Sequence, residues 1–345
     1  MATTLPTPRD EEELEALLAA PTRETTEAAA TLEGDVLVLG AGGKMGPSLA
    51  ALAKRSIDAA GVPHRVLCVS RFGSPGVPDR LRRLGIETIA ADLLDRDELR
   101  RLPDAPNVIY LAGMKFGTSG APHLTWALNC YLPALVAERF RESRIVALST
   151  GNVYPLVPVS GRGADETTEP APVGEYAQSC LGRERLFEFV ASRHGTPMLL
   201  VRLNYATDLR YGVLLDIARK VRRGEPVDVS MGAVNTIWQG DANAAVLRGL
   251  GLCANPPRVL NVTGPEVVSV REAALRFAEL LGTQATFTGA ESDLALLSDA
   301  SRYHSLLGLP GVSAETLVDW TAEWVRNELP TLDKPTHFET RDGRF

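Results

Sequence analysis

Short apolar runs alternate with longer helical segments along most of the chain. Strands that are apolar over nearly their whole length, with helices between them, are typical of a parallel sheet covered on both faces. The pattern therefore predicts a doubly wound α/β fold with about seven strands. The expected strands are 35–39, 65–69, 87–90, 107–111, 144–149, 198–203 and 258–263, with the clearest helices at 45–60, 122–142 and 173–194.

The rhythm changes on either side of this region. Near the N-terminus, acidic residues crowd the first turn of an expected helix at 9–20, where the helix dipole favours them. After the sixth strand, helices mix with glycine and proline turns, which predicts a smaller lobe over the carboxyl ends of the strands, where ligands bind in this architecture. The expected parts are an extension at 1–33, a sheet domain at 34–203 with 257–263, a substrate lobe at 204–256 with 264–330, and a polar tail at 331–345.

Composition narrows the classes of function. The 345 residues include 36 Lys and Arg against 43 Asp and Glu, a net charge of −7, which argues against a nucleic-acid binder because such proteins need a basic face. No run of 18 apolar residues predicts a membrane span, and the acidic start is unlike a signal peptide. Four separated cysteines and five histidines without ligand spacing predict a cytoplasmic protein with reduced thiols and no metal site.

A glycine-rich loop joins the first expected strand to the first long helix. Its sequence, Gly40-Ala-Gly-Gly43-Lys-Met-Gly46, spaces three glycines three residues apart. Such glycines permit a tight turn, close approach of a pyrophosphate to the backbone, and close packing of helix on strand. The helix N-terminus adds N–H donors and a positive dipole end. We expect this loop, with Lys44 and Met45, to bind a dinucleotide in a Rossmann domain; the alternative is a glycine turn without a ligand.

Residues after the second and third strands bear on which dinucleotide is bound. Ser70 and Arg71 follow the second strand, where an acidic residue would favour NAD and an arginine suits the 2′-phosphate of NADP. We therefore expect NADP, with NAD as the second choice. Asp92 and Leu93 follow the third strand, where a side chain can contact adenine, although Asp92 alone would also suit a helix N-cap.

Several motifs in this order resemble the extended short-chain dehydrogenase/reductase family, which includes sugar-nucleotide epimerases and dehydratases. The resemblance runs from about Asp35 to Trp324. It implies that the segment after the fourth strand and an asparagine in the next helix line the cofactor. It also implies that Thr150 and Tyr176 are the catalytic pair. The matching residues are Gly40, Gly43, Gly46, Asp92, Leu93, Leu111, Ala112, Gly113, Lys115, Asn129, Thr150, Tyr176 and the Arg202-Leu-Asn204 segment.

The resemblance implies hydride transfer between a nicotinamide and a carbinol carbon. Tyr176 would exchange the hydroxyl proton, and Thr150 would hydrogen-bond the same oxygen. In this family the hydride leaves for good in a dehydrogenase, or returns to the other face in an epimerase. Dehydratases carry an Asp-Glu pair after the threonine, where this chain has Gly151-Asn152, so dehydratase chemistry is not favoured.

One position departs from the family pattern. The pattern Tyr-x-x-x-Lys is here Tyr176-Ala-Gln-Ser-Cys180, and a neutral thiol neither binds the nicotinamide ribose nor lowers the pKa of the tyrosine. Lys115 or Arg183 is expected to supply the missing charge, since Arg183 shares a helical face with Tyr176 and Cys180. Cys180 itself is either a small core residue or a reactive thiol, of which the first is favoured.

The expected substrate is a sugar, a sugar acid or a sugar nucleotide. Trp238 would either stack on a ring or belong to the core, and the core is favoured. The helices at 122–142 and 173–194 pair across dimer interfaces in the family, so a homodimer is expected. The alternative function is a non-catalytic dinucleotide-binding sensor or partner protein, which Cys180 favours and which Thr150 and Tyr176 disfavour. The substrate candidates are Thr150, Asn152, Asn204, Arg210, Tyr211, Asn235, Trp238 and Gln239.

Overall fold

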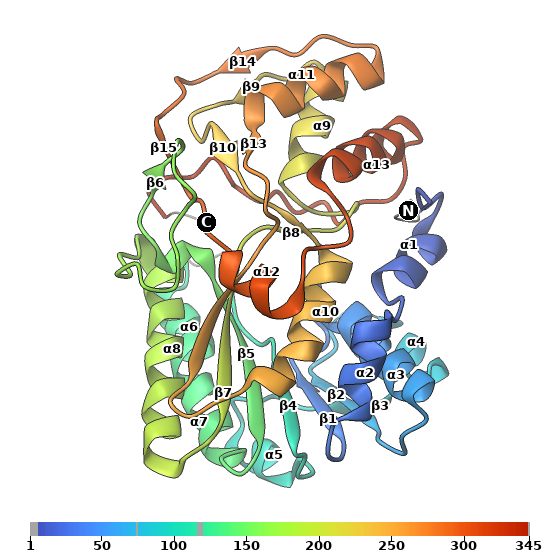
Figure 1. Cartoon of the computed structure of the whole chain (residues 1–345), viewed down its shortest axis with the longest axis vertical. Coiled ribbons are helices and arrows are strands. Elements are labelled where there is room, and N and C mark those ends of the chain that lie inside the picture. Colours follow the sequence, from blue (N-terminus) through green and yellow to red (C-terminus); the bar gives the residue numbers. More distant parts are fainter. Residues whose placement is uncertain (1–5, 74, 116–119, 344–345) are drawn as a thin grey trace.

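A seven-stranded parallel sheet forms the centre of the computed structural model, which describes residues 6–73, 75–115 and 120–343 (Figure 1). Every neighbouring pair in the sheet is parallel. The predicted doubly wound α/β fold with about seven strands is therefore confirmed. In spatial order the strands are β12 (Arg258–Val262), β7 (Met198–Leu203), β5 (Arg144–Thr150), β4 (Asn107–Tyr110), β1 (Val36–Leu39), β2 (Val66–Ser70) and β3 (Glu87–Ala90). The chain adds β2 and β3 on one side of β1 and then returns with β4 to the other, so β1 and β4 flank the switch point where ligands bind in such sheets.

Alternate residues of each strand face opposite layers of helices. Val36 and Val38 pack in an apolar cluster with residues of α2 (Arg23–Ala30), α3 (Gly46–Ala60), α4 (Val77–Arg83) and α10 (Gln239–Gly249). Leu37 and Leu39 pack in a second cluster with residues of α5 (Arg96–Arg101), α7 (Leu132–Arg139) and α8 (Gly174–His194). Both faces of the sheet are covered, which explains why its strands are apolar throughout.

The N-terminal extension joins the sheet domain to the second lobe. Thr22 and Thr25 form a capping box that starts α2, and Thr25 also meets Ser56 of α3 through a 3.1 Å hydrogen bond. In α1 (Glu11–Leu18), Leu14 and Leu18 belong to the apolar core of the second lobe. The extension is thus packed against both parts of the molecule along its described residues.

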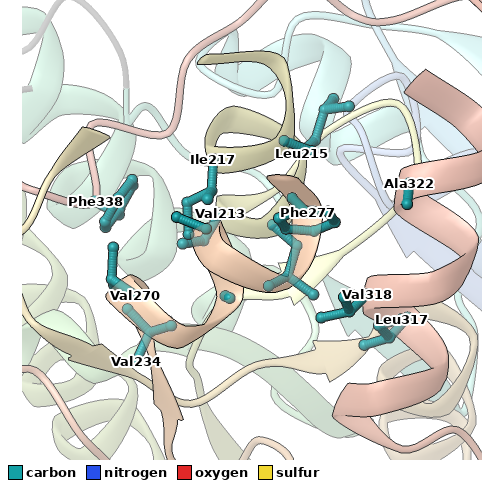
Figure 2. Close-up of a cluster of buried hydrophobic side chains, with 14 of the residues drawn as sticks. Val213, Leu215, Ile217, Val234, Val270, Phe277, Leu317, Val318, Ala322 and Phe338 are labelled. Atoms are coloured by element: carbon teal, nitrogen blue, oxygen red, sulfur yellow. The ribbon is translucent and has the colours of Figure 1, made fainter. Parts of the chain in front are cut away.

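The second lobe has its own core, built from three helices. These are α9 (Val213–Arg223), α11 (Val270–Leu281) and α13 (Ala314–Arg326), which occupy the upper half of Figure 1. Val213, Ile217, Phe277 and Val318 meet in its centre, as Figure 2 shows. The remaining short elements are η2 (Gly151–Val153), β6 (Val157–Pro158), β8 (Ala206–Thr207), β9 (Val227–Asp228), β10 (Ala233–Val234), β11 (Ile237–Trp238), η3 (Leu250–Leu252), β13 (Val268–Ser269), β14 (Phe287–Thr288), β15 (Leu294–Ala295) and α12 (Ser301–Leu307).

The predicted polar tail is tied to the body of the protein through residue 343. We call residues 331–343 the strap. Phe338 is only 2% exposed and packs in the core of the second lobe (Figure 2). Thr336 donates its backbone N–H (2.8 Å) and its hydroxyl (2.6 Å) to Asp216 of α9. A Cβ placed on Gly174, at the start of α8, would lie 2.3 Å from the carbonyl oxygen of Gly343, so the strap also touches the sheet domain. Residues 344–345 of the predicted tail and 1–5 of the predicted extension lie outside the described residues.

The helix expected at 122–142 is interrupted. It consists of α6 (Pro122–Trp126), a π-helical turn η1 (Ala127–Tyr131) and α7. Pro133 has no N–H to donate to the carbonyl four residues earlier, which explains why the regular pattern gives way at this point. Among the described helices, none is long and apolar enough to cross a membrane.

Candidate functional site

The glycine loop and the residues after three further strands enclose one pocket. It has a volume of about 370 Å³ and lies at the carboxyl ends of β1, β2, β3 and β4. Gly42, Phe72, Gly73, Ala91, Leu128 and Leu132 complete its lining. The residues predicted to bind a cofactor that the structure brings to this pocket are Gly40, Gly43, Ser70, Arg71, Asp92, Leu93, Leu111, Ala112 and Gly113.

The three spaced glycines of the loop differ in what a Cβ at their positions would meet. Gly40 has a φ of +85°, and a Cβ there would lie 2.6 Å from the backbone nitrogen of Ala112. A Cβ on Gly46 would lie 2.3 Å from the carbonyl oxygen of Ala41, so this glycine lets α3 pack closely against the loop. At Gly43 the nearest atom is 3.4 Å away, which leaves an open cradle in front of the backbone. Residues of this kind fit a pyrophosphate.

The N-terminus of α3 faces the same cradle. Met45 occupies the N-cap position and provides no side-chain hydrogen bond to the first turn. The first N–H groups of a helix need partners from outside the helix, and an anion is a suitable one. Met45 itself packs against the apolar cluster of that face, so the structure places its side chain in the core rather than in the pocket.

The side chain of Lys44 points away from the pocket and toward the second lobe. Its Nζ donates to the carbonyl oxygen of Ala206 at 2.8 Å and lies 4.2 Å from the ring centre of Tyr211. Burial lowers the pKa of Lys44 to about 7, and the nearby Lys115 lowers it further while Asp208 opposes the shift. The structure thus places Lys44 and Tyr211 together where the glycine loop meets the second lobe.

Arg71 and Asp92 face each other across the rim of the pocket. Arg71 Nη1 lies 3.9 Å from Asp92 Oδ2, and the two side chains are 68% and 44% exposed. Asp92 also accepts a hydrogen bond from the backbone of Leu94 at 3.0 Å, so it shapes the turn after β3 as well as lining the pocket. An exposed guanidinium at this rim can turn toward a phosphate group.

Asn129 does not line the pocket but holds a segment next to it in place. It is fully buried in η1, and its amide holds the backbone of Met114 in both directions, accepting from the nitrogen (2.8 Å) and donating to the oxygen (2.9 Å). It also donates to Ser179 Oγ of α8 at 3.0 Å. The structure therefore gives Asn129 a positioning role for the segment after β4, with no surface left for direct contact with a cofactor.

The two predicted catalytic residues meet at the carboxyl end of β5. The side chains of Thr150 and Cys180 both hydrogen-bond to the phenol of Tyr176. Burial raises the pKa of Tyr176, and Cys180 raises it further, whereas Arg183 and the Thr150 hydrogen bond act to lower it. Thr150 Oγ1 also accepts from the backbone of Asn152 at 3.2 Å, which places the half-buried Asn152 beside the pair.

The position of the expected lysine is filled by a buried thiol. Cys180 is 0% exposed, and burial raises its pKa, so it is a neutral residue at ordinary pH. Arg183, one turn further along α8, is 7% exposed and reaches back toward Cys180 and Tyr176, whose charges it influences. Lys115 lies on the other side, where its Nζ donates to the strap at Thr336 (3.5 Å) and burial lowers its pKa to about 8.

Most substrate candidates from the second lobe have structural partners instead. Asn204 and Asn235 are bonded to each other at 2.9 Å and are at most 3% exposed. Trp238 is 2% exposed and packs edge-on against Trp320, which agrees with the core alternative. Gln239 is fully buried against Ser48, and Arg210 is held by Asp208 and Glu15. None of these five presents its side chain to a ligand.

Three features of the site had no clear signal in the sequence. Tyr205 follows the sixth strand with a φ of +46°, a strained value for a side chain of this size, and such strain concentrates at functional sites. The strap reaches Lys115 although its sequence has no periodicity. Glu184 is buried beside Arg183 but pairs with Arg202, a contact that depends on the packing of α8 against β7.

Comparison with known proteins gives likenesses of fold. No family model matches the chain, and no curated protein matches its sequence. Among solved structures, a UDP-glucuronic acid 4-epimerase from Bacillus cereus in complex with UDP-glucuronic acid and NAD has a TM-score of 0.69 at 20% identity, over 85% of this chain and 99% of its own. A UDP-glucose 4-epimerase from Thermotoga maritima with UDP-glucose has a TM-score of 0.68 at 20% identity, over 85% and 99%. MoeE5 in complex with UDP-glucose and NAD has a TM-score of 0.67 at 22% identity, over 86% and 99%. The resemblance to the extended short-chain dehydrogenase/reductase family is thereby confirmed at the level of the fold.

Proposed function

We propose that this protein is an NAD(P)-dependent oxidoreductase or epimerase that acts on a carbinol carbon of an acidic sugar, either a sugar acid or a sugar nucleotide. The observation that carries the proposal is the hydrogen-bonded pair of Thr150 and Tyr176 at the carboxyl end of β5, next to the strand β4 whose carboxyl end lines the pocket. The solved structures of similar fold that contain UDP-sugars and NAD support it.

The cofactor fits the residues that are present. The open cradle at Gly43 and the uncapped N-terminus of α3 would hold its pyrophosphate, and Asp92 and Leu93 would lie against its adenine end. When bound, a nicotinamide dinucleotide supplies the acceptor and donor for a hydride. Lacking any such group of its own, the chain provides binding, orientation and proton transfer.

Tyr176 would move the proton of the reacting hydroxyl. As a base, its phenolate oxygen would take that proton, and the phenol would return it when the hydride is given back. Thr150 would hydrogen-bond the same substrate oxygen and hold it in line with the phenol. Retention of both residues favours an enzyme over a sensor, because a sensor requires neither.

An acidic substrate is favoured by the charges on the substrate side. Lys115 lies close enough to Lys44 for its charge to lower the pKa of Lys44, and both side chains are half-buried. Two ammonium groups held near one another at low dielectric favour a carboxylate or phosphate between or beside them. We infer that this pair, with Tyr211, holds the acidic group of the substrate while Tyr176 acts on a carbinol carbon.

The cofactor choice depends on Arg71. Asp92 partly neutralises its charge in the absence of a ligand, and the 2′-phosphate of NADP would offer the guanidinium a stronger partner. We propose that both dinucleotides bind and that Arg71 favours NADP.

We also propose a homodimer. Three large aromatic side chains of α6, η1 and α8 are exposed: Trp126 is 40%, Tyr131 45% and Phe189 55% exposed. Large exposed aromatic residues of this kind are enriched at protein interfaces.

The direct test uses purified protein with NAD or NADP and two probes, UDP-glucuronic acid and UDP-glucose. We expect epimer formation, followed by NMR, or net reduction of the dinucleotide, followed by absorbance, and loss of either in Tyr176→Phe with dinucleotide affinity unchanged. Tight dinucleotide binding without turnover on these probes or on a panel of sugar acids would instead favour the non-catalytic sensor, for which the replacement of lysine by Cys180 is the supporting observation.

A further inference from the structure

Arg183 is a buried cation without a carboxylate partner. Its side chain is 7% exposed, and within the described part of the chain no Asp or Glu lies within ion-pair distance of it. The adjacent Glu184 points to Arg202 instead, with Nη2 to Oε2 at 2.7 Å. An uncompensated buried charge is costly, so the fold retains Arg183 at the expense of stability.

The guanidinium is fixed by neutral groups only. Nη1 donates to the carbonyl oxygen of Leu148 at 2.6 Å, and Nη2 donates to Asn129 Oδ1 at 2.8 Å. Among the residues that the structure describes, none accepts a hydrogen bond from the buried Nε. These bonds fix the orientation of the guanidinium but leave its charge unbalanced, so any group nearby that can become an anion is stabilised by it.

The ionisable groups that face Arg183 are weak acids. They come from three elements: Tyr110 on β4, Cys130 on η1, and Tyr176 and Cys180 on α8 itself. Of these, only Tyr176 is both partly exposed and bonded to Thr150 at the proposed site. Lys115 and Glu184 also act on Cys180, with opposite signs.

The geometry of α8 allows the guanidinium of Arg183 to approach the phenol of Tyr176. Tyr176 and Arg183 are seven residues apart, which is about two turns or roughly 10 Å along the axis. Long side chains of a helix lean toward its N-terminus, so the arginine covers much of this distance and passes Cys180 on the way. A lysine at position 180 would place a second cation beside the first, whereas cysteine leaves room for the guanidinium.

Gly113, on the segment after β4, also leaves space for the guanidinium of Arg183. A Cβ on Gly113 would lie 2.4 Å from Arg183 Nη2, and Gly113 also lines the dinucleotide pocket. The guanidinium therefore lies directly behind the segment after β4, between the pocket and the catalytic helix.

We propose that Arg183 is the positioning residue that replaces the lysine of the Tyr-x-x-x-Lys pattern, stabilising the phenolate of Tyr176 from behind Cys180. This proposal rests on the proposed function, since it assigns Tyr176 the role of the base. In the forward step Tyr176 phenolate would take the hydroxyl proton of the substrate, with a bound dinucleotide supplying the hydride acceptor, and Arg183 would stay protonated throughout. Lys115, bonded to the strap, acts on the substrate instead.

The test measures the titration of Tyr176 directly. Protein labelled with ¹³C-tyrosine is studied by NMR with NAD bound, and Tyr176→Phe assigns the signal. Because Arg183 opposes the effect of burial, we expect the pKa of Tyr176 to be at least one unit higher in Arg183→Gln than in the unmodified protein. The matched control, Arg185→Gln, removes an exposed arginine of the same helix and is expected to leave the titration unchanged.

Turnover gives a second readout. In Arg183→Gln, we expect kcat/KM at neutral pH to fall at least tenfold and its pH profile to move to higher pH. Adding Cys180→Lys to this variant restores a cation at the family's position and is expected to recover part of both. A Tyr176 signal that titrates alike in the unmodified protein and in Arg183→Gln overturns the proposal.

These readouts separate this proposal from the proposed function. If no probe is turned over, the NMR titration still decides the role of Arg183. If Arg183→Gln does not fold, the milder variant Arg183→Lys is titrated in its place. Its shorter side chain cannot keep both guanidinium hydrogen bonds, so the Tyr176 signal should still move to higher pH, and an unmoved signal overturns the proposal.

Discussion

Arg202 and Glu184 form a buried ion pair that joins β7 to α8. Arg202 donates through Nε to Oε1 at 3.0 Å and through Nη2 to Oε2 at 2.7 Å, and the side chains are 5% and 0% exposed. Ser149 donates to the same carboxylate, and Tyr154 accepts from Arg202 Nη1 at 2.8 Å. The pair therefore fixes the helix that carries Tyr176 and Arg183 to the strand ends at the site.

Removing one partner of this pair should be strongly destabilising. Glu184→Gln leaves the Arg202 charge uncompensated, and we expect a loss of about 3–5 kcal/mol in the free energy of unfolding. Urea denaturation measures it. The control, Glu188→Gln, breaks the exposed pair with Arg185 on the same helix and should cost about 0–1 kcal/mol. Equal losses in the two variants would contradict the assignment.

A substitution at Gly43 should reduce the affinity for a dinucleotide without destabilising the fold. A Cβ at this position meets no atom closer than 3.4 Å and the backbone is not left-handed, so Gly43→Ala should fold with nearly unchanged stability. The added methyl group would fill the cradle, and we expect dinucleotide affinity to fall at least tenfold by calorimetric titration. Gly46→Ala is the contrasting variant, because its Cβ would lie 2.3 Å from Ala41 and should destabilise the fold itself. Unchanged affinity in Gly43→Ala would mean that the loop is a turn without a ligand.

Arg71 should control the choice between NADP and NAD. Replacing it with Ala removes the only cation at the described rim of the pocket, so we expect weaker binding of NADP with NAD affinity nearly unchanged. Parallel calorimetric titrations of both dinucleotides measure the ratio. If the unmodified protein already prefers NAD, the Arg71 argument is wrong while the pocket assignment stands.

Lys44 should make both stability and acid binding depend on pH. Because burial lowers its pKa from 10.5 to about 7, the folded protein bears the cost of burying its charge fully below about pH 7. Between pH 7 and 10.5 the folded state has released this proton and the unfolded state has not, so stability rises with pH there. We expect Lys44→Met to be more stable than the unmodified protein below pH 7 and equal to it above 10.5, measured by denaturation across pH.

The titration of Lys44 also predicts how the affinity for an acidic ligand depends on pH. Affinity for UDP-glucuronic acid should fall as pH rises through about 7 in the unmodified protein, and Lys44→Met should remove this dependence. Lys54→Met, which alters an exposed pair with Asp58, is the control and should keep it. A pH dependence that survives in Lys44→Met would exclude Lys44 from the anion site.

The proposed homodimer is tested by the face that carries Phe189. Phe189→Glu places a charge among the exposed aromatic residues, and sedimentation at micromolar concentration should then show a shift from dimer to monomer. Leu309→Glu, at a 70% exposed position between α12 and α13, is the control and should leave the dimer intact. A monomer in the unmodified protein would remove the proposal.

The pattern of the sequence predicted the sheet because its physical cause is local. Every residue of β1 must be apolar, because alternate side chains meet a helix layer on opposite faces of the sheet. The sequence shows this directly, since residues 36–39 are all Val or Leu. The glycine loop was predictable in part for the same reason, because a Cβ on Gly43 or Gly46 would meet backbone only three to five residues away. The contact of Gly40 with Ala112 is distant in sequence, and there the glycine spacing was the only signal.

Burial in the second lobe was not predictable in this way. Asn204 and Asn235 have the residue type of substrate ligands, but they bond to each other because two segments 31 residues apart in sequence meet there. Arg183 and Glu184 are neighbours in sequence with opposite partners, and only the packing of α8 decides which side each one faces. The strap is held by the buried Phe338 and by separate polar contacts such as those of Thr336 and Arg341, which leave no periodic pattern to find.

The π-helical turn around Asn129 sets a limit on how this chain can change its length. A π turn holds one residue more than the α-helix it interrupts, so deleting one residue from 127–131 would give a regular helix that is easier to form. The same deletion would turn everything on one side of it by about 100° relative to the other. Asn129 would lose Met114, Ser179 and Arg183 together. An extra residue that weakens the helix is thus what keeps three segments in register, and shortened variants should gain helicity while losing the pocket.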